Sequence, residues 1–140
     1  MAPAGSGFRR LQAWRAARRL VVSVYALTDT FPSTEQYCLT QQMKKAGHSV
    51  HSNIAEGYGR LSKGEWIQFL GHSRGSLMEL ESDLIAAFDL GYCTKEHAGE
   101  IARQIKRAVQ LVNGLLRSAM RKEFDSKKYS QPRNRRPVPG

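Results

Sequence analysis

The sequence feature that most restricts the fold of this chain is a spacing of apolar residues by alternating steps of four and three. This spacing recurs in four separate stretches, with polar or charged residues filling most positions between. Because residues three and four apart lie on one face of an α-helix, each stretch predicts an amphipathic helix. The predicted helices span about residues 8–29, 34–56, 63–90 and 94–120. Four such helices joined by short turns predict an all-α fold, an antiparallel up-down-up-down four-helix bundle.

The residues on these four stripes form the predicted core. From the first helix to the fourth they are Ala13, Ala17, Leu20, Val24, Leu27 and Phe31; Leu39, Met43, Ala46, Val50, Asn53 and Gly57; Trp66, Leu70, Ser73, Leu77, Leu80, Leu84 and Ala87; and Ile101, Ile105, Ala108, Val112, Leu115 and Ala119. Gly71 and Gly75 are poor helix residues inside the third stretch, so they predict that a neighbour packs closely there.

The sequence S-N-I-A-E-G-Y-G-R at 52–60 indicates the end of the second helix and the turn that follows it. Gly57 and Gly59 can adopt the positive φ angles that end a helix. Ser62 and Glu65 then have the Ser-x-x-Glu spacing of a capping box, in which each side chain satisfies a backbone N–H at a helix start. The stretch therefore predicts a helical hairpin near the middle of the chain.

The other helix boundaries are indicated by proline, glycine and short polar residues. Pro32 should end the first helix, because the residue before a proline leaves the helical conformation. Ser33 with Gln36 predicts a cap for the second helix. Gly91 is the predicted stop of the third helix, and Thr94 is the predicted cap of the fourth.

The two ends of the chain and its cysteines set further bounds. Residues 1–7 lack the apolar core of a signal peptide and predict a flexible leader. Residues 121–140 are polar and basic and predict a disordered tail. Cys38 and Cys93 form no C-x-x-C motif, which favours free thiols in a reducing cytoplasm over a zinc or redox site. No apolar run approaches the roughly 20 residues that span a bilayer, so we expect a cytoplasmic protein.

The charge of the chain is strongly positive and unevenly distributed. Lys and Arg number 22 against 12 Asp and Glu, a net charge of +10. Residues 1–29 carry +4, 94–120 carry +3 and 121–140 carry +5, whereas 62–93 carry −3. Since the first and fourth helices of such a bundle are neighbours, their cations predict one basic wall. A wall of this kind indicates nucleic acid, a membrane surface or an acidic protein as partner, unless it is simply a solvated surface.

The cations of this wall, with a cationic face of the second helix, are the candidate contacts to nucleic-acid phosphates. They are Arg9, Arg10, Arg15, Arg18, Arg19, Lys44, His48, His51, Arg103, Lys106, Arg107, Arg117, Arg121 and Lys122. The planar fork of arginine can grip a phosphate at two oxygens, and the affinity should fall steeply with salt. The sequence has no zinc finger, helix-turn-helix signature or aromatic RNA-binding platform, so it predicts no reading of bases.

Several polar residues of the second and third helices require partners. Asn53 falls on the core stripe, where an unpaired amide costs on the order of a few kcal/mol, so we expect a structural hydrogen bond to a neighbouring turn. Glu56 is expected to pair with Arg60 or with Arg74. The acids of the third helix form a solvated face or meet basic helices of another subunit; they are Glu79, Glu81, Asp83 and Asp89.

Catalytic, metal and membrane functions are alternatives with weaker support. His48 and His51 are three residues apart and could hold a metal, but no third ligand is evident. Ser49, His51 and Glu56 could be combined into a hydrolase site, but no nucleophile elbow or oxyanion loop accompanies them. We therefore predict no enzyme, no metal and no cofactor. The first helix also resembles a membrane-surface helix, although its apolar stripe is needed inside the bundle.

The hairpin sequence also carries a family resemblance. The supporting segments are S-N-I-A-E-G-Y-G-R at 52–60, A-W-R-A-A-R-R-L at 13–20, F-P at 31–32, G-S-L-M-E-L-E-S at 75–82 and D-L-G-Y at 89–92. Over about residues 11–116 the chain resembles the four-helix-bundle proteins encoded in intervening sequences of bacterial large ribosomal RNA. These proteins are related to the accessory variability determinant of diversity-generating retroelements.

The resemblance implies a homo-pentameric barrel with a positive surface, and in the retroelement branch an accessory subunit that binds a reverse transcriptase and template RNA. No reverse-transcriptase motif occurs in this chain, so we expect a non-enzymatic scaffold for RNA or RNA/DNA. The motif contributes a structural set of residues, Asn53, Glu56, Gly57, Gly59 and Arg60. The alternative is a protein–protein interaction module that does not bind nucleic acid directly.

Overall fold

The computed structural model describes residues 7–130, and the side chains of residues 7–121. Its elements, in order, are a 3-10 helix η1 (Gly7–Arg10), α1 (Gln12–Thr28), a second 3-10 helix η2 (Ser33–Glu35), α2 (Leu39–Tyr58), α3 (Lys63–Asp89) and α4 (Lys95–Ser130). Every regular element in this part of the chain is helical, as the apolar spacing predicted.

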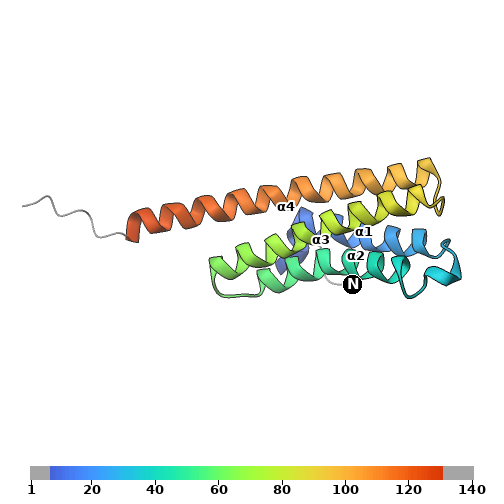
Figure 1. Cartoon of the computed structure of the whole chain (residues 1–140). Helices are drawn as coiled ribbons and strands as arrows, with labels where there is room; N and C mark the ends of the chain where they lie inside the picture. Colours follow the sequence, from blue (N-terminus) through green and yellow to red (C-terminus); the bar gives the residue numbers. More distant parts are fainter. Residues whose placement is uncertain (1–6, 131–140) are drawn as a thin grey trace, which may run out of the picture.

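The four long helices run up, down, up and down, and each packs against the next along the chain (Figure 1). α1 and α4 also pack together and close the bundle, whereas the diagonal pairs, α1 with α3 and α2 with α4, stay further apart. Across the α1–α4 contact, the side-chain amide of Gln104 donates to the hydroxyl of Ser23 at 3.0 Å. The predicted four-helix bundle is therefore confirmed, with α1 and α4 as neighbours.

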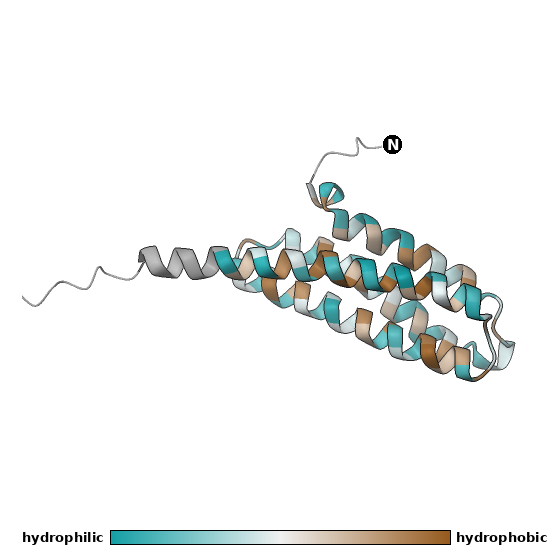
Figure 2. Cartoon of the chain, turned by 90° about the horizontal axis from the view of Figure 1, so that it is seen from above, coloured by the Kyte–Doolittle hydropathy of each residue, from teal (hydrophilic) through white to brown (hydrophobic). Residues whose placement is uncertain are grey.

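The core follows the predicted stripes. The largest fully buried apolar side chains are Leu20, Val24, Met43, Val50, Ile54, Leu70, Leu77, Leu80, Ile105 and Val112. Figure 2 shows hydrophobic and hydrophilic positions alternating along the helices, the pattern of amphipathic helices. None of the described helices combines the length and apolar character that crossing a lipid bilayer requires.

The second helix starts later than the sequence predicted. α2 begins at Leu39, and no capping side-chain bond forms at the first residue of η2 or α2, so the predicted cap of Ser33 with Gln36 is wrong. Glu35 acts there instead, because its Oε2 accepts from the backbone N–H of Leu39 at 3.3 Å. Its Oε1 accepts from the hydroxyl of Tyr92 at 2.8 Å, so one carboxylate joins the start of α2 to the α3–α4 turn.

The boundaries of α3 and α4 largely match their predicted signals. The hydroxyl of Ser62 accepts from the backbone N–H of Glu65 at 3.1 Å, as one half of a capping box does. Thr94 caps α4 in the same way, accepting from the N–H of His97 at 3.1 Å. After α3, Gly91 adopts a φ of +78°, a left-handed conformation in which glycine is favoured.

The glycines of the hairpin act differently from the prediction. α2 continues through Gly57 to Tyr58, and Gly59 ends it at a φ of −78°, so neither glycine supplies a positive φ. Gly57 is instead required by close packing, since a Cβ there would lie 2.6 Å from the Cβ of Phe69. The packing predicted at Gly71 and Gly75 is wrong, because a Cβ at either position would meet nothing within 4 Å.

The fourth helix is longer than predicted. α4 runs on to Ser130, so residues 121–130 are helical where the sequence predicted a disordered tail. These ten residues contain neither glycine nor proline and several good helix formers, which permits the extension. In Figure 1 α4 projects beyond the ends of the other helices. The predicted leader, apart from Gly7, and the predicted tail from 131 to 140 lie outside the described residues.

Candidate nucleic-acid interface

The predicted basic residues of η1, α1 and α4 are at the surface. Those classed as exposed are Arg9, Arg10, Arg18, Arg19, Arg103, Lys106, Arg107, Arg117 and Arg121. Arg15 is half-buried, and its Nε donates to the backbone carbonyl of Arg9 at 2.7 Å. The side chain of Lys122 lies outside the described part. A local hydrogen bond therefore holds the Arg15 side chain of α1 against the backbone of η1.

The antiparallel contact brings the cations of α1 and α4 to the same level of the bundle. Ser23 and Gln104 are opposite each other. Arg19 lies four residues before Ser23 on α1, and Arg107 lies three residues after Gln104 on α4, so both fall at about one height. Arg10 lies in η1, which packs against α1 and α2, so its neighbourhood with Arg117 stays a prediction.

Apart from Arg15, the described cations of these helices form no ion pair with a described carboxylate. Between described side chains one ion pair forms, from Arg60 to Glu56 at 2.7 Å within the hairpin motif. It settles the predicted alternatives for Glu56, since Arg74 donates its Nε to Asn113 Oδ1 at 3.0 Å instead. The exposed arginines of η1 and α1 therefore have no carboxylate partner among the acids of α3 that the structure describes.

Two cations outside the hairpin lie against aromatic rings. The guanidinium carbon of Arg18 is 5.7 Å from the ring centroid of Trp14, one turn before it on α1. The Nζ of Lys44 on α2 is 4.9 Å from the ring centroid of Tyr25 on α1. Such cation–π contacts hold a charge in place while leaving much of its hydrogen-bonding capacity unused.

His48 and His51 face each other on α2, with ring centroids 4.9 Å apart. Burial lowers the pKa of His51 below its usual value, and the neighbouring His48 lowers that pKa further. Among the described residues, no three His, Cys, Asp or Glu side chains come together as a metal site would require. His51 therefore favours its neutral form, and the pair lies on the same helix as Lys44.

The motif residue Asn53 is held by a small polar network between α2 and α3. Its Nδ2 donates to the carbonyl and hydroxyl oxygens of Ser49, at 2.8 and 2.7 Å. The hydroxyl of Ser76 on α3 is 2.8 Å from that of Ser49. Nearby, the fully buried Ser73 donates its hydroxyl to the carbonyl of Val50 at 2.8 Å. The expected partner of Asn53 exists, but it lies one turn earlier on the same helix.

The rest of the motif also serves packing. Gly57 leaves room for Trp66 and Phe69, and the guanidinium carbon of Arg60 lies 5.1 Å from the ring centroid of Phe69. Arg60 is bonded to Glu56 at the same time. Gly57 and Arg60 thus contact α3, and Glu56 holds Arg60 at the end of α2.

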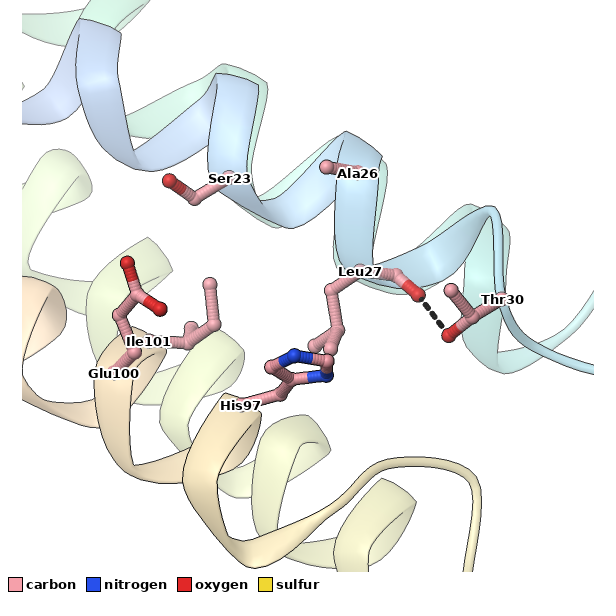
Figure 3. Close-up of a pocket in the computed structure, with 7 residues that line it drawn as sticks. All are labelled: Ser23, Ala26, Leu27, Thr30, His97, Glu100 and Ile101. Atoms are coloured by element: carbon pink, nitrogen blue, oxygen red, sulfur yellow. Dashed lines mark hydrogen bonds between the residues drawn. The ribbon is translucent and has the colours of Figure 1, made fainter.

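A hollow of about 210 Å³ lies between α1 and α4. Figure 3 shows the side chains of His97 and Glu100 on α4 beside those of Ser23, Leu27 and Thr30. The hydroxyl of Thr30 donates to the carbonyl of Leu27 at 2.7 Å. The lining is mostly apolar and includes a carboxylate but no Lys or Arg, which does not favour a phosphate.

A second surface, which we call the α1–α2 groove, was not predicted from the sequence. It has a volume of about 510 Å³, and its lining includes Tyr25, Tyr37, Thr40, Lys44, Lys45 and His48. Lys44 and His48 were predicted from charge, whereas the tyrosines were not selected. The available signal was the polar and cationic spacing of 41, 44, 45 and 48 on one side of α2, with tyrosines nearby in the sequence.

The fold and this charge distribution define the class of the chain, a small basic four-helix-bundle protein. The pattern of the 23S rRNA-intervening sequence protein family matches residues 9–114, and the chain belongs to that family. This finding confirms the resemblance to the ribosomal RNA family. Among curated proteins, no significant match is found.

A solved structure with a similar fold is a protein of unknown function from the S23 ribosomal protein family of Bacteroides thetaiotaomicron. The two chains are 21% identical and superpose with a TM-score of 0.68. The match covers 74% of this chain and 97% of the Bacteroides chain. At this identity the likeness concerns the fold, and it agrees with the bundle described above.

Proposed function

We propose that the chain is a non-enzymatic scaffold that binds RNA, or an RNA/DNA hybrid, through contacts between its cations and phosphates. The observation that carries the proposal is the set of exposed arginines and lysines on η1, α1 and α4 without carboxylate partners in the described chain. The family name, which refers to ribosomal RNA, favours RNA among the possible polyanions.

The physical basis of binding is the release of counterions. Each phosphate that a cation neutralises frees condensed ions, so the logarithm of the affinity falls linearly with the logarithm of the salt concentration. Arginine is well suited, because its planar guanidinium can form two parallel hydrogen bonds with one phosphate. Contacts of this kind position a protein on RNA without selecting a sequence.

The proposal is tested by titrating a fluorescently labelled RNA hairpin while the salt is raised from about 50 to 200 mM. We expect Arg18→Glu with Arg19→Glu to lower the affinity at least tenfold and to reduce the salt dependence. The matched control is Lys63→Glu with Lys95→Glu, which removes the same net charge at the starts of α3 and α4. Binding that is absent at low salt, or equally weakened by the control, contradicts the proposal.

The proposal includes assembly into a homo-oligomer, a ring of five copies as the family resemblance implies. Large apolar side chains on and just after α3 remain exposed in the single chain, with 56% of Ile85, 44% of Phe88 and 58% of Leu90 accessible. Where a reverse transcriptase acts on the bound nucleic acid, the chain would be its non-catalytic accessory subunit. Sedimentation velocity tests the assembly, and a purely monomeric chain at micromolar concentration contradicts it.

The alternative function is a protein-interaction module that does not contact nucleic acid. The same exposed apolar residues of α3 would suit a protein partner. A partner that stays bound after nuclease treatment and high salt, together with no RNA binding by the purified chain, would favour this alternative. RNA binding by the purified chain would favour the scaffold.

A further inference from the structure

The α1–α2 groove combines exposed aromatic rings with cations. Tyr37 is 80% exposed in the segment between η2 and α2, and Tyr25 on α1 is 44% exposed. The Nζ of Lys44 lies 4.9 Å from the centroid of the Tyr25 ring. Flat apolar rings beside ammonium groups are the combination on which nucleic-acid bases stack while their phosphates are neutralised.

The charge of the groove has one sign. Lys44 and Lys45 line it, and no carboxylate does. Its remaining lining is polar, including Gln36 and Gln41, whose amides can donate and accept hydrogen bonds. An anionic ligand that also carries hydrogen-bonding groups fits this surface better than an apolar one.

Polar groups in the groove lack partners within the described chain. Thr40 lines the groove with 8% of its surface exposed, and its hydroxyl forms no hydrogen bond to a described residue. The backbone N–H groups of Thr40 and Gln41, in the first turn of α2, also meet no acceptor there. N–H groups in the first turn of a helix have no partner within the helix, so here they can donate to water or to the acceptor atoms of a ligand.

We propose that the α1–α2 groove binds an unpaired nucleotide of RNA, with its base against Tyr37 and its phosphate on Lys44 and Lys45. The inference rests on the proposed function. It adds a second RNA contact to the one made by the cations of η1, α1 and α4. The cations of η1, α1 and α4 hold phosphates of any strand, whereas the groove selects strands whose bases are accessible.

The size and shape of the groove decide between possible ligands. A volume of about 510 Å³ lies within the range of roughly 300–1,000 Å³ usual for small-ligand sites, which suits one nucleotide. A duplex buries its bases in the stack and cannot offer one to Tyr37. The groove is largely open to solvent, so a nucleotide can enter while it remains joined to its strand.

The test compares a labelled single-stranded oligoribonucleotide with a duplex of the same length at one salt concentration. We expect Tyr37→Ala to lower the affinity for the single strand about fivefold to tenfold, because base–aromatic stacking is lost. Affinity for the duplex should stay within about twofold of the wild type, since the duplex relies on phosphate contacts. Tyr37→Phe keeps the ring and should retain binding of the single strand.

Tyr58→Ala is the matched control, because Tyr58 is partly exposed at the other end of α2, in contact with Trp66. It should leave the affinities for the single strand and for the duplex unchanged.

A second probe is adenosine monophosphate, a nucleotide that is not part of a strand, which should bind only weakly. Ultraviolet crosslinking of a 4-thiouridine strand should label the segment from η2 to His48.

The outcomes separate the groove from the wider proposal. Loss of single-strand affinity in Tyr37→Ala, with the duplex unaffected, supports the groove. Binding of both RNAs that Tyr37→Ala leaves unchanged overturns the groove and leaves the scaffold proposal standing. Failure of the wild-type chain to bind either RNA overturns both. Tight binding of adenosine monophosphate would assign the groove to a free nucleotide and overturn the RNA assignment.

Discussion

Two faces of α2 differ in how their polar groups are used. The face towards α3 carries Ser49, Asn53 and Gly57, and each is engaged by hydrogen bonds or close packing. The face towards the α1–α2 groove carries Lys44 and Lys45, which have no carboxylate partner in the described chain. One helix thus holds a packed surface and an open one.

This difference shows that the family motif and the groups available to a ligand lie on different faces of α2. In residues 52–60, by which the family can be recognised, Asn53 and Glu56 form local bonds and Gly57 packs against α3. The open face has no comparable sequence pattern, although its groups are available to a ligand. The most recognisable stretch therefore reports the fold, and substitutions on the two faces should affect different measurements.

The largest expected effect is on the packed face. We expect Gly57→Ala to lower the free energy of unfolding by about 1–3 kcal/mol, because its Cβ would overlap Phe69 and Trp66. The measurement is urea unfolding followed by circular dichroism. Gly71→Ala is the matched control and should stabilise α3 by up to about 1 kcal/mol, since its Cβ meets no atom within 4 Å. Equal effects of the two variants would contradict the close contact.

The next effect is on the open face. Lys44→Glu with Lys45→Glu should lower RNA affinity about tenfold, equivalent to about 1.4 kcal/mol, by repelling phosphate. The free energy of unfolding should change by less than about 0.5 kcal/mol, as is usual for surface positions. Anisotropy titration and urea unfolding of the same sample check both. A loss of stability as large as the loss of binding would remove the distinction between the faces.

A smaller effect is expected at the buried hydroxyl between α2 and α3. Ser73→Ala removes the bond to the carbonyl of Val50 and should lower the free energy of unfolding by about 1 kcal/mol. RNA affinity should not change, because Ser73 is fully buried and away from the groove lining. A changed affinity in a stably folded variant would show that the two faces are coupled. Ser82→Ala, at an exposed position of α3, is the control.

The smallest effect lies outside both faces, at Asp83 on α3. Burial raises the pKa of its carboxyl, and the nearby Glu79 raises that pKa further. A raised folded-state pKa gives stability that is complete below the unfolded pKa of about 3.9 and is lost as pH rises through the folded pKa.

Asp83→Asn should therefore stabilise the chain at pH 7, by no more than about 0.5 kcal/mol because the residue as a whole is only partly buried. The variant should also show a flatter dependence of stability on pH above about 4. Urea unfolding at pH 4 and pH 7 provides the check. Destabilisation at pH 7 would indicate a partner that the charged form of Asp83 requires.

The fold could be predicted from the sequence because apolar spacing fixes which residues are buried. The stripes through Leu20, Val50, Leu77 and Ile105 are buried as predicted. The predictions that were wrong concern the roles of single residues, because those roles depend on contacts with residues distant in the sequence. Gly57 was interpreted through its backbone freedom, but its role is set by Phe69, which no local pattern reveals.

The candidate site was predictable in its charge and not in its shape. Arg18 and Arg19 are exposed, as their position opposite the apolar stripe required. The groove needs Tyr25 of α1 and Tyr37 near α2 to line the same surface, and that placement depends on where α2 begins. The late start of α2 at Leu39 involves Glu35, whose second contact is with Tyr92, so short-range sequence rules could not find it.

The carboxylate of Glu35 has a consequence for Tyr37, two residues further on. Glu35 is tied at one oxygen to Leu39 and at the other to Tyr92, so the segment that presents Tyr37 is anchored to a loop on the opposite hairpin. Removing the single hydroxyl in Tyr92→Phe would cut this tether without touching the ligand surface. The segment that carries Tyr37 would then sample more positions, and an RNA strand bound in the α1–α2 groove would dissociate sooner.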